Sequence, residues 1–540
     1  MNDPVISRLF SIYFTYFLHH HFWFSCKIKL MPLPKPVRIL FLCSEADPLV
    51  KVGGLGDVGG SLPHALHALT TYLSSQGDQQ AIDVDIRLVI PFHGVINRQI
   101  YKPERLASFE VNHKNGPIQA TAYQVNLNQV PVYLISGEPL KPDAPVYSGD
   151  WGYDAHKYIF YSLAALELAR LIDFQPHVVH ANDWHTSAAV YWLGLHREKD
   201  PFFNQTRTLL SVHNLPFLGI DGGFPMDSFY LPPAPEGILP EWARQLPLPL
   251  GLYSADRVNT VSPTYGKEIL TPEFGAGLES FLQTRSETIS GILNGIDVER
   301  WDPGNDSYLI EPYSMDALEK RQANKKALLR EVGFATDARV VDQNIPLFAM
   351  ITRMDYQKGI DLAIAAFEQL ARQKKYRWQA LILGTGLPEL EENVRELQDQ
   401  FPDKIHAVLK FDAPLSHRIY AGADALLMPS RYEPCGLAQM IAMRYGCLPV
   451  ARETGGLADT IYDVEKSPRR NGFLFKTASP EALLKTLQRV LKMYQNQTEW
   501  QAVQAQGVRQ DFSWKRSALA YLNLYEMLMT EDLKKIETIL

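Results

Sequence analysis

Short, continuous apolar runs alternate with amphipathic stretches along most of the chain, a pattern typical of buried parallel strands joined by helices. In the first half the apolar runs occupy 38–43, 84–91, 130–136, 176–183, 208–214 and 257–263. In the second half they occupy 346–351, 379–384, 404–411, 425–430, 447–452 and 472–475. Helical stretches such as 156–171 lie between several of them. The repeated plan predicts an α/β protein with two doubly wound parallel sheets.

The two strand series divide the chain near residue 290, where a linker-like stretch, 292–306, follows the first series. We expect one domain over residues 37–289 and a second domain that begins at residue 290. The chain of 540 residues is long enough for both, because domains usually contain about 100–200 residues. Residues 215–250 are rich in Pro and Gly and are expected to form an ordered surface excursion or lid.

The first thirty residues differ from the rest of the chain in composition. The stretch 9–24 is aromatic-rich, but the three adjacent histidines at 19–21 interrupt it, and it lacks a small-residue cleavage site. It is therefore too polar and too short for a membrane span and is a poor signal peptide. We expect residues 1–36 to form a disordered extension.

The overall charge and the cysteines exclude some classes of partner. A formal net charge of -7 argues against nucleic acid, because no basic face is left to neutralise phosphates. The four cysteines form no C-x-x-C pair and no disulfide-like framework, which favours the reducing cytoplasm. No metal site is evident, and no cofactor or membrane contact is predicted.

A glycine-rich loop, KVGGLGDVGG at 51–60, follows the first predicted strand and leads into a helix-like stretch. Such a loop can direct backbone N–H groups and a helix dipole at a phosphate. Gly54, Gly56 and Gly59 also fit the spacing G-x-G-x-x-G, with Asp83 a little over twenty residues further on. A nicotinamide dehydrogenase is therefore a competing interpretation.

A second candidate site lies around Glu433, between the apolar run 425–428 and an amphipathic helical pattern. Open α/β sheets bind ligands at this position, beyond the carboxyl ends of their strands. A single Glu before a helix can also be only a capping charge. The turn Thr454-Gly455-Gly456 follows the next strand, and two such turns side by side indicate a ligand site rather than two caps.

Other polar side chains also follow predicted strands. Asp183 and His213 come at the ends of successive strands, where clustering favours a functional role over separate structural ones. Arg353 and Lys358 stand five residues apart in a strand-to-helix loop and can converge on one anion. The alternative for this pair is two solvated surface cations.

With these motifs placed, the chain resembles the bacterial and plant glycogen and starch synthases, family 5 of the retaining glucosyltransferases with two Rossmann-like (GT-B) domains. The motifs follow the family order from about residue 37 to the C-terminus. They are KVGGLGD (51–57), NDWHT (182–186), VHN (212–214), VSPTYGKEI (261–269), LNGID (293–297), TRMDYQKG (352–359), SRYEPCGLAQM (430–440), TGGLADT (454–460) and DFSW (511–514).

The resemblance implies a role for each matched residue. Asp183 would face the acceptor or the transferred sugar, His213 would bond the glucose 6-hydroxyl, and Glu433 would hold the glucose hydroxyls. Arg353 and Lys358 would bind the two donor phosphates. The remaining donor-site residues would be Lys51, Gly53, Gly54, Gly56, Asn294, Cys435, Gly436, Leu437, Thr454, Gly455 and Gly456.

The resemblance also implies the domain roles and the reaction. The domain over 37–289 would bind the acceptor, the domain over 290–508 would bind the nucleotide sugar, and residues 509–540 would form a helix that returns to the first domain. The expected reaction moves glucose from ADP-glucose to an α-1,4-glucan with retention of configuration. The alternatives are a UDP-glucose donor, a different acceptor, or a glucan-binding or priming protein without turnover. The dehydrogenase interpretation has no use for the motifs of the second half.

Overall fold

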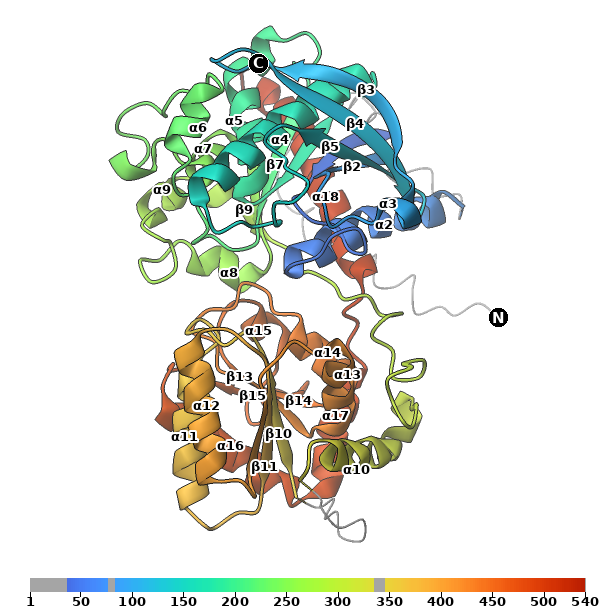
Figure 1. Ribbon diagram of the computed structural model, residues 1–540, viewed down its shortest axis with the longest axis vertical. Coiled ribbons are helices and arrows are strands. Elements are labelled where there is room, and N and C mark those ends of the chain that lie inside the picture. Colours follow the sequence, from blue (N-terminus) through green and yellow to red (C-terminus); the bar gives the residue numbers. More distant parts are fainter. Residues whose placement is uncertain (1–35, 76–82, 335–344, 540) are drawn as a thin grey trace, which may run out of the picture.

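A computed structural model of the protein describes residues 36–75, 83–334 and 345–539. The extension expected over residues 1–36 lies outside these ranges, apart from Pro36. The described chain forms two α/β domains, each built around its own sheet, one above the other in Figure 1. The predicted fold class of two doubly wound α/β domains is confirmed.

Among the described residues the first sheet has nine strands, in the order β3-β4-β5-β2-β1-β6-β7-β8-β9. The pairs from β5 to β9 in this order are parallel, whereas β3 pairs with β4, and β4 with β5, in antiparallel fashion. The strands are β1 (Val37–Leu42), β2 (Val84–Pro91), β3 (Glu104–Val111), β4 (Ile118–Leu127), β5 (Val130–Gly137), β6 (Val178–Asn182), β7 (Arg207–Val212), β8 (Arg257–Thr260) and β9 (Ile289–Gly291).

The antiparallel hairpin of β3 and β4 corrects the sequence prediction, which has only parallel strands in this domain. Most residues of β3 are exposed or half-buried because the strand lies at the edge of the sheet. A strand of this kind alternates polar and apolar residues instead of forming a continuous apolar run.

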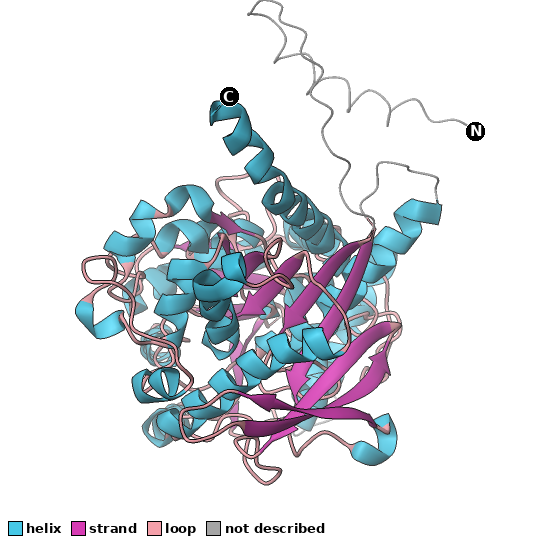
Figure 2. Ribbon diagram, turned by 90° about the horizontal axis from the view of Figure 1, so that it is seen from above, coloured by secondary structure: helices cyan, strands magenta, loops and turns pink. Residues whose placement is uncertain are grey.

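Helices cover both faces of this sheet, as Figure 2 shows from above. Along β1, Ile39 and Phe41 belong to the hydrophobic cluster that includes α2 and α18, while Leu40 and Leu42 belong to the cluster with α4 and α5. The alternation follows from the two-residue period of a strand. The helices of this domain are α2 (Gly54–Ser75), α3 (Arg98–Tyr101), α4 (Trp151–Leu171), α5 (Trp184–His196), α6 (Gly223–Ser228), α7 (Pro247–Ser254), α8 (Pro263–Glu268) and α9 (Glu279–Thr284).

The second sheet, as far as it is described, has six parallel strands in the order β12-β11-β10-β13-β14-β15. They are β10 (Leu347–Ile351), β11 (Gln379–Leu383), β12 (Ile405–Val408), β13 (Ala425–Met428), β14 (Leu448–Arg452) and β15 (Phe473–Phe475). The accompanying helices are α10 (Arg321–Glu331), α11 (Ile360–Arg372), α12 (Pro388–Gln400), α13 (Ala413–Gly422), α14 (Ala438–Arg444), α15 (Gly455–Thr460), α16 (Pro480–Tyr494) and α17 (Gln497–Val508).

The last helix, α18 (Trp514–Ile539), packs against α2 of the first domain. Two of its tyrosines bond to side chains of the first sheet: Tyr525 Oη lies 2.8 Å from Nδ1 of His180 in β6, and Asn259 in β8 donates to Tyr521 Oη (3.0 Å). The chain therefore crosses between the domains twice, once after β9 and once before α18.

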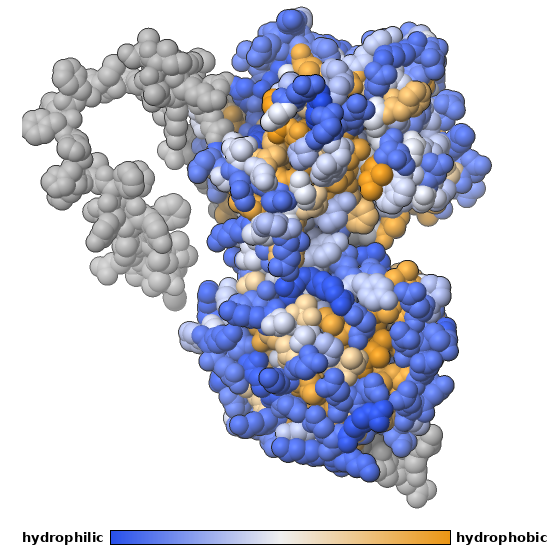
Figure 3. All heavy atoms as spheres, turned by 90° about the vertical axis from the view of Figure 1, so that its left-hand side faces the viewer, coloured by the Kyte–Doolittle hydropathy of each residue, from blue (hydrophilic) through white to orange (hydrophobic). Residues whose placement is uncertain are grey.

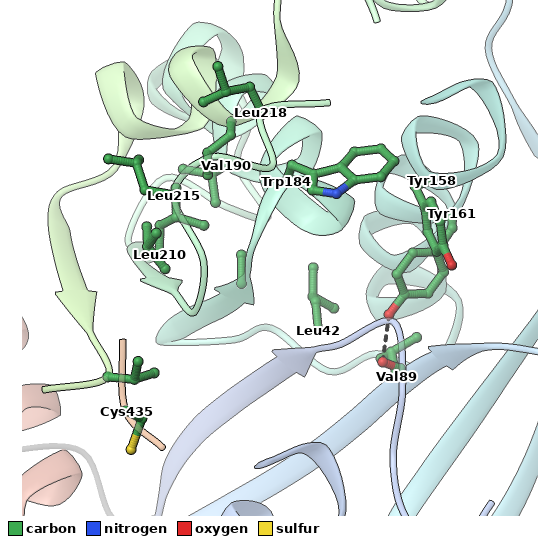
Figure 4. Close-up of a cluster of buried hydrophobic side chains, with 14 of the residues drawn as sticks. Leu42, Val89, Tyr158, Tyr161, Trp184, Val190, Leu210, Leu215, Leu218 and Cys435 are labelled. Carbon is green, nitrogen blue, oxygen red and sulfur yellow. Dashed lines mark hydrogen bonds between the residues drawn. The ribbon is translucent and has the colours of Figure 1, made fainter. Parts of the chain in front are cut away.

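The two domains form two lobes separated by a narrower waist (Figure 3). One hydrophobic cluster nevertheless includes buried residues of both domains. Figure 4 shows its part in the first domain, with Cys435 of the second domain at the margin. Within the described ranges, no helix is long and apolar enough to cross a membrane.

Candidate active site

The sequence-predicted residues of the first domain follow the carboxyl ends of β1, β6 and β7. Those of the second domain follow β10, β13 and β14, apart from Asn294 in the connection after β9. Both sets therefore lie at the sheet edges where doubly wound folds bind ligands. A Cβ atom placed on Gly54 would lie 4.0 Å from Leu437 Cδ1, so the two edges approach each other across the domain boundary.

Asp183 combines a strained backbone with a buried carboxylate. Its φ of 56° and ψ of -172° lie in a region that residues other than glycine rarely adopt. Its Oδ1 accepts hydrogen bonds from the N–H groups of His213 (2.7 Å) and Asn214 (3.4 Å). Burial nevertheless raises the pKa of Asp183 to about 7. The strain, the burial and the raised pKa together indicate a functional carboxylate.

The His213 ring is fixed in one protonation state. Its Nε2 lies 2.9 Å from Asn182 Oδ1, and since an amide oxygen only accepts, Nε2 carries the hydrogen and donates it. Burial lowers the pKa of His213 to about 3, so the ring is neutral at physiological pH. Its Nδ1 then has a lone pair that can accept a hydrogen bond from a ligand hydroxyl.

Asn214 Oδ1 and Asn294 Oδ1 are among the buried amide oxygens that have no hydrogen-bond partner in the described residues. Asn214 follows His213, and the backbone of Asn294 contacts the Cys435 thiol. Buried polar groups in native proteins nearly always have partners. Because the Asn214 and Asn294 amide oxygens lie beside the other candidate residues, a ligand hydroxyl is a suitable partner for each.

Lys358 and Glu433 form an ion pair within the second domain. Lys358 Nζ lies 2.9 and 2.7 Å from the two carboxylate oxygens of Glu433, whose side chain is 7% exposed. Ser430 Oγ donates to the same carboxylate (2.9 Å). The structure thus joins two residues that the sequence analysis assigns to different parts of the donor.

Arg353 lies apart from this ion pair. Its guanidinium group lies 3.2 Å from Asp355 and donates to Gln357 (3.4 Å), and its side chain is 65% exposed. Arg353 and Lys358 therefore have different carboxylate partners in this structure, and their convergence on one anion stays a prediction.

The turn Thr454-Gly455-Gly456 lies against the backbone that carries Glu433. A Cβ atom on Gly455 would lie 2.0 Å from the Glu433 carbonyl oxygen, and one on Gly456 would lie 2.0 Å from that of Cys435. Gly455 also has a φ of +43°. Only glycine permits this approach, so the turn and the Glu433 loop form one unit.

In the glycine loop of the first domain, two backbone N–H groups have a protein partner, and phosphate binding by the loop stays a prediction. The N–H groups of Val52 and Gly53 donate to the Glu45 carboxylate (2.5 and 3.1 Å) instead of pointing at open space. α2 already begins at Gly54, and a Cβ on Gly59 would lie 2.1 Å from the Glu45 carbonyl oxygen. Gly59 therefore serves close helix packing, which the G-x-G-x-x-G pattern alone did not distinguish from phosphate binding.

Lys51 is the cation of this loop. Its Nζ lies 2.5 Å from Asp57 Oδ1 and 3.5 Å from Asp47 Oδ2, and its side chain is 35% exposed. Burial raises the pKa of Asp57, although Lys51 opposes the shift. Arg300, from the connection to the second domain, also pairs with Asp47 (2.7 Å). Lys51 is thus held within reach of solvent beside the domain boundary.

Two further residues organise the site, Glu45 and Glu268, and neither was predicted as a site residue. Glu45 is 1% exposed and also accepts a hydrogen bond from Tyr147 Oη. Its position just after the first apolar run was the available signal, as for Asp183 and His213. Glu268 lies within the motif at 261–269, but its place at the end of a helix in the first domain did not indicate its contact with the turn at Thr454.

Comparison with known proteins gives matches over nearly the whole described chain. Residues 38–284 match the family model described as the starch synthase catalytic domain, and residues 336–505 match that of the glycosyl transferases group 1. The glycogen synthase of an Anaeromyxobacter species is 39% identical over 506 residues, which cover 91% of this chain and 99% of that protein. The glycogen synthase of Thermotoga maritima is 36% identical over 512 residues, covering 92% and 99%.

Two solved structures are also similar. The catalytic domain of starch synthase IV from Arabidopsis thaliana, bound to ADP and acarbose, has a TM-score of 0.79 and 28% identity, covering 92% of this chain and 100% of that one. Sucrose-phosphate synthase from Thermosynechococcus elongatus has a TM-score of 0.54 and 18% identity at the same coverage. The second match bears on the fold alone.

Proposed function

Because the chain belongs to the family of glycogen and starch synthases, we propose that it transfers glucose from ADP-glucose to the non-reducing end of an α-1,4-glucan, with retention of configuration. As a member of this family it is a glycosyltransferase with the GT-B fold. The dehydrogenase interpretation of the glycine loop is wrong. The identity of the donor and the retention of configuration go beyond what membership of the family establishes.

The observation that carries the proposal is the division of the site between the two domains. The second domain contributes the Lys358–Glu433 ion pair, and the first contributes the buried Asp183 and the neutral His213. A nucleotide sugar has an anionic diphosphate and a hydroxyl-rich sugar. The cation Lys358 suits the diphosphate, and Glu433, Asp183 and His213 suit the sugar.

On the phosphate side, Lys358, Arg353 and Lys51 would face the donor diphosphate. Breaking the bond between the sugar C1 and the phosphate oxygen leaves negative charge on the diphosphate, and fixed cations stabilise that charge in the transition state. Gly53, Gly54 and Gly56, together with the turn Thr454-Gly455-Gly456, would close on the same group. Lys358 would then exchange part of its contact with Glu433 for a phosphate oxygen.

On the sugar side, Glu433 would hold the glucose hydroxyls. His213 would accept the hydrogen of the 6-hydroxyl at Nδ1, since its Nε2 hydrogen is already donated to Asn182. Asn294, whose Oδ1 has no partner among the described residues, would accept a further hydroxyl. Cys435, Gly436 and Leu437 would line the same pocket.

For the reaction we propose no protein nucleophile. The bond from C1 to the diphosphate breaks, the acceptor 4-hydroxyl oxygen bonds to C1 on the same face, and its proton passes to the departing phosphate. The sugar becomes oxocarbenium-like on the way, and the nearby Asp183 carboxylate favours that charge when ionised. Within the described ranges, no group of three or more His, Cys, Asp or Glu side chains is arranged to hold a metal ion.

The proposal includes the expected domain roles. The domain over residues 37–289 would bind the acceptor, the domain over 290–508 would bind the nucleotide sugar, and the helix within 509–540 would return to the first domain. The first sheet continues to Gly291, two residues past the expected boundary. We further propose a cytoplasmic enzyme that does not act on nucleic acid or membranes.

ADP-glucose is preferred to UDP-glucose because the similar Arabidopsis structure is bound to ADP. The alternative of a glucan-binding protein without turnover is disfavoured, because Lys51, Arg353, Lys358 and Glu433 are all present.

Transfer of labelled glucose from ADP-glucose and from UDP-glucose into glycogen, measured side by side, tests the proposal. A higher kcat/KM for UDP-glucose would overturn the donor, and no transfer from either would overturn the function.

A further inference from the structure

A short helix of the first domain, α8, contacts both donor-side loops of the second domain. Ser262, which caps α8, donates from Oγ to the Pro434 carbonyl oxygen (2.7 Å). At the other end of α8, the Glu268 carboxylate accepts hydrogen bonds from Thr454 Oγ1 (2.9 Å) and from the Gly455 N–H (3.0 and 3.1 Å to its two oxygens). One element thus holds the loop of Glu433 and the glycine turn at once.

The contact is reciprocal between the domains. Asp459 of α15 accepts hydrogen bonds from the N–H (2.8 Å) and the Oγ1 (2.7 Å) of Thr264, near the start of α8. Each helix therefore receives a carboxylate from the other domain near its N-terminal end, where backbone N–H groups have no partner within the helix. Figure 1 shows α8 and α15 facing each other at the domain boundary.

The effect of Glu268 can be followed to the donor pocket through hydrogen bonds and contacts. Glu268 fixes Thr454 and Gly455, and the Gly456 N–H donates to the Glu433 carbonyl oxygen (3.1 Å). The turn has no room to shift toward that backbone, because even a Cβ atom on Gly455 would be 2.0 Å from it. The Glu433 side chain in turn holds Lys358. A carboxylate of the first domain therefore sets the backbone that presents the sugar- and phosphate-side residues of the second.

We propose that Glu268 is a positioning residue of the donor pocket, which acts through the Thr454–Gly456 turn. This role rests on the proposed function, since the turn is taken to close on the donor diphosphate. Glu268 itself touches no reacting atom. Its loss raises the KM for the nucleotide sugar more than it lowers kcat, because the misplaced turn weakens donor binding before the chemical step.

Two variants and a matched control test this role. Glu268→Ala should raise the donor KM and weaken ADP binding by about tenfold, the size of one or two lost charge-assisted hydrogen bonds. Glu268→Gln should give a donor KM between those of the wild type and Glu268→Ala, because the amide oxygen still accepts one of the hydrogen bonds. Asp459→Asn weakens the other half of the same domain contact but leaves the Glu268 hydrogen bonds to Thr454 and Gly455 in place, so it should change the donor KM less than about twofold. An equal KM for Glu268→Ala and Asp459→Asn would overturn the proposal.

Amide hydrogen exchange of the ligand-free protein separates this proposal from the enzymatic one. Glu268→Ala should speed exchange in peptides that cover Thr454–Gly456 and Glu433, and Asp459→Asn should leave those peptides at the wild-type rate. Unchanged exchange in Glu268→Ala would overturn the positioning role even if the enzyme is active. Failure of the proposed function would show instead as a wild-type enzyme that transfers no glucose from either donor.

Discussion

At the scale of single residues, Lys358 is the cation whose loss is most informative. We expect Lys358→Ala to lower kcat by about 10²–10³-fold and to raise the donor KM by less. The reason is that negative charge on the diphosphate grows as the bond to the sugar breaks. The substitution leaves the buried Glu433 carboxylate with Ser430 as its remaining side-chain donor in the described structure. Thermal midpoints measured beside the steady-state kinetics separate loss of fold from loss of catalysis. A change in KM alone would contradict the assigned role.

Asp183 gives a prediction about pH. Its pKa is about 7 in the folded protein, against about 3.9 in an unfolded chain. The folded state therefore binds the proton more tightly, so the stability that Asp183 contributes is present below about pH 4 and is lost as pH rises to about 7. The free energy of unfolding of Asp183→Asn, relative to wild type, should rise across this window. Denaturant titrations at pH 4, 5.5 and 7 measure this difference in the free energy of unfolding. A difference that does not change with pH would contradict the raised pKa.

At the scale of elements, the two glycine segments should respond differently to a methyl group. Gly456→Ala would place Cβ 2.0 Å from the Cys435 carbonyl oxygen, so we expect a loss of about 1–3 kcal/mol in stability as well as activity. Nothing lies within 4 Å of a Cβ on Gly53, so Gly53→Ala should keep the thermal midpoint. If Gly53 faces the diphosphate, its variant should still raise the donor KM. An unchanged KM for Gly53→Ala would remove it from the proposed site.

The elements also show what the sequence could predict. Buried parallel strands such as β1 and β10 form continuous apolar runs, and their ends indicate where ligand-binding side chains collect, which is how Asp183 and Glu433 were found. The β3–β4 hairpin was missed because exposed edge strands lack such runs, although Asn115-Gly116 between them is a hairpin signal. Glu268 and Asp459 lie within the motifs at 261–269 and 454–460, but their contacts were not predicted. Their partners are nearly two hundred residues away in sequence, and only the domain arrangement brings them together.

At the scale of the whole molecule, the connection of the domains by two chain crossings allows hinge motion. We expect ADP to draw the two lobes together, because the proposed donor site takes residues from both. Small-angle scattering with and without saturating ADP should show a smaller radius of gyration in its presence. An unchanged radius would argue against closure.

Lys358 and Glu433, the two members of the ion pair, are proposed to bind different halves of one donor. Calorimetric titration of ADP, which lacks the sugar, into Glu433→Ala tests this directly. Glu433 is proposed to contact only glucose, and its removal frees Lys358 for phosphate, so ADP affinity should stay within about twofold of wild type while glucose transfer is lost. Loss of ADP affinity in Glu433→Ala would contradict the account.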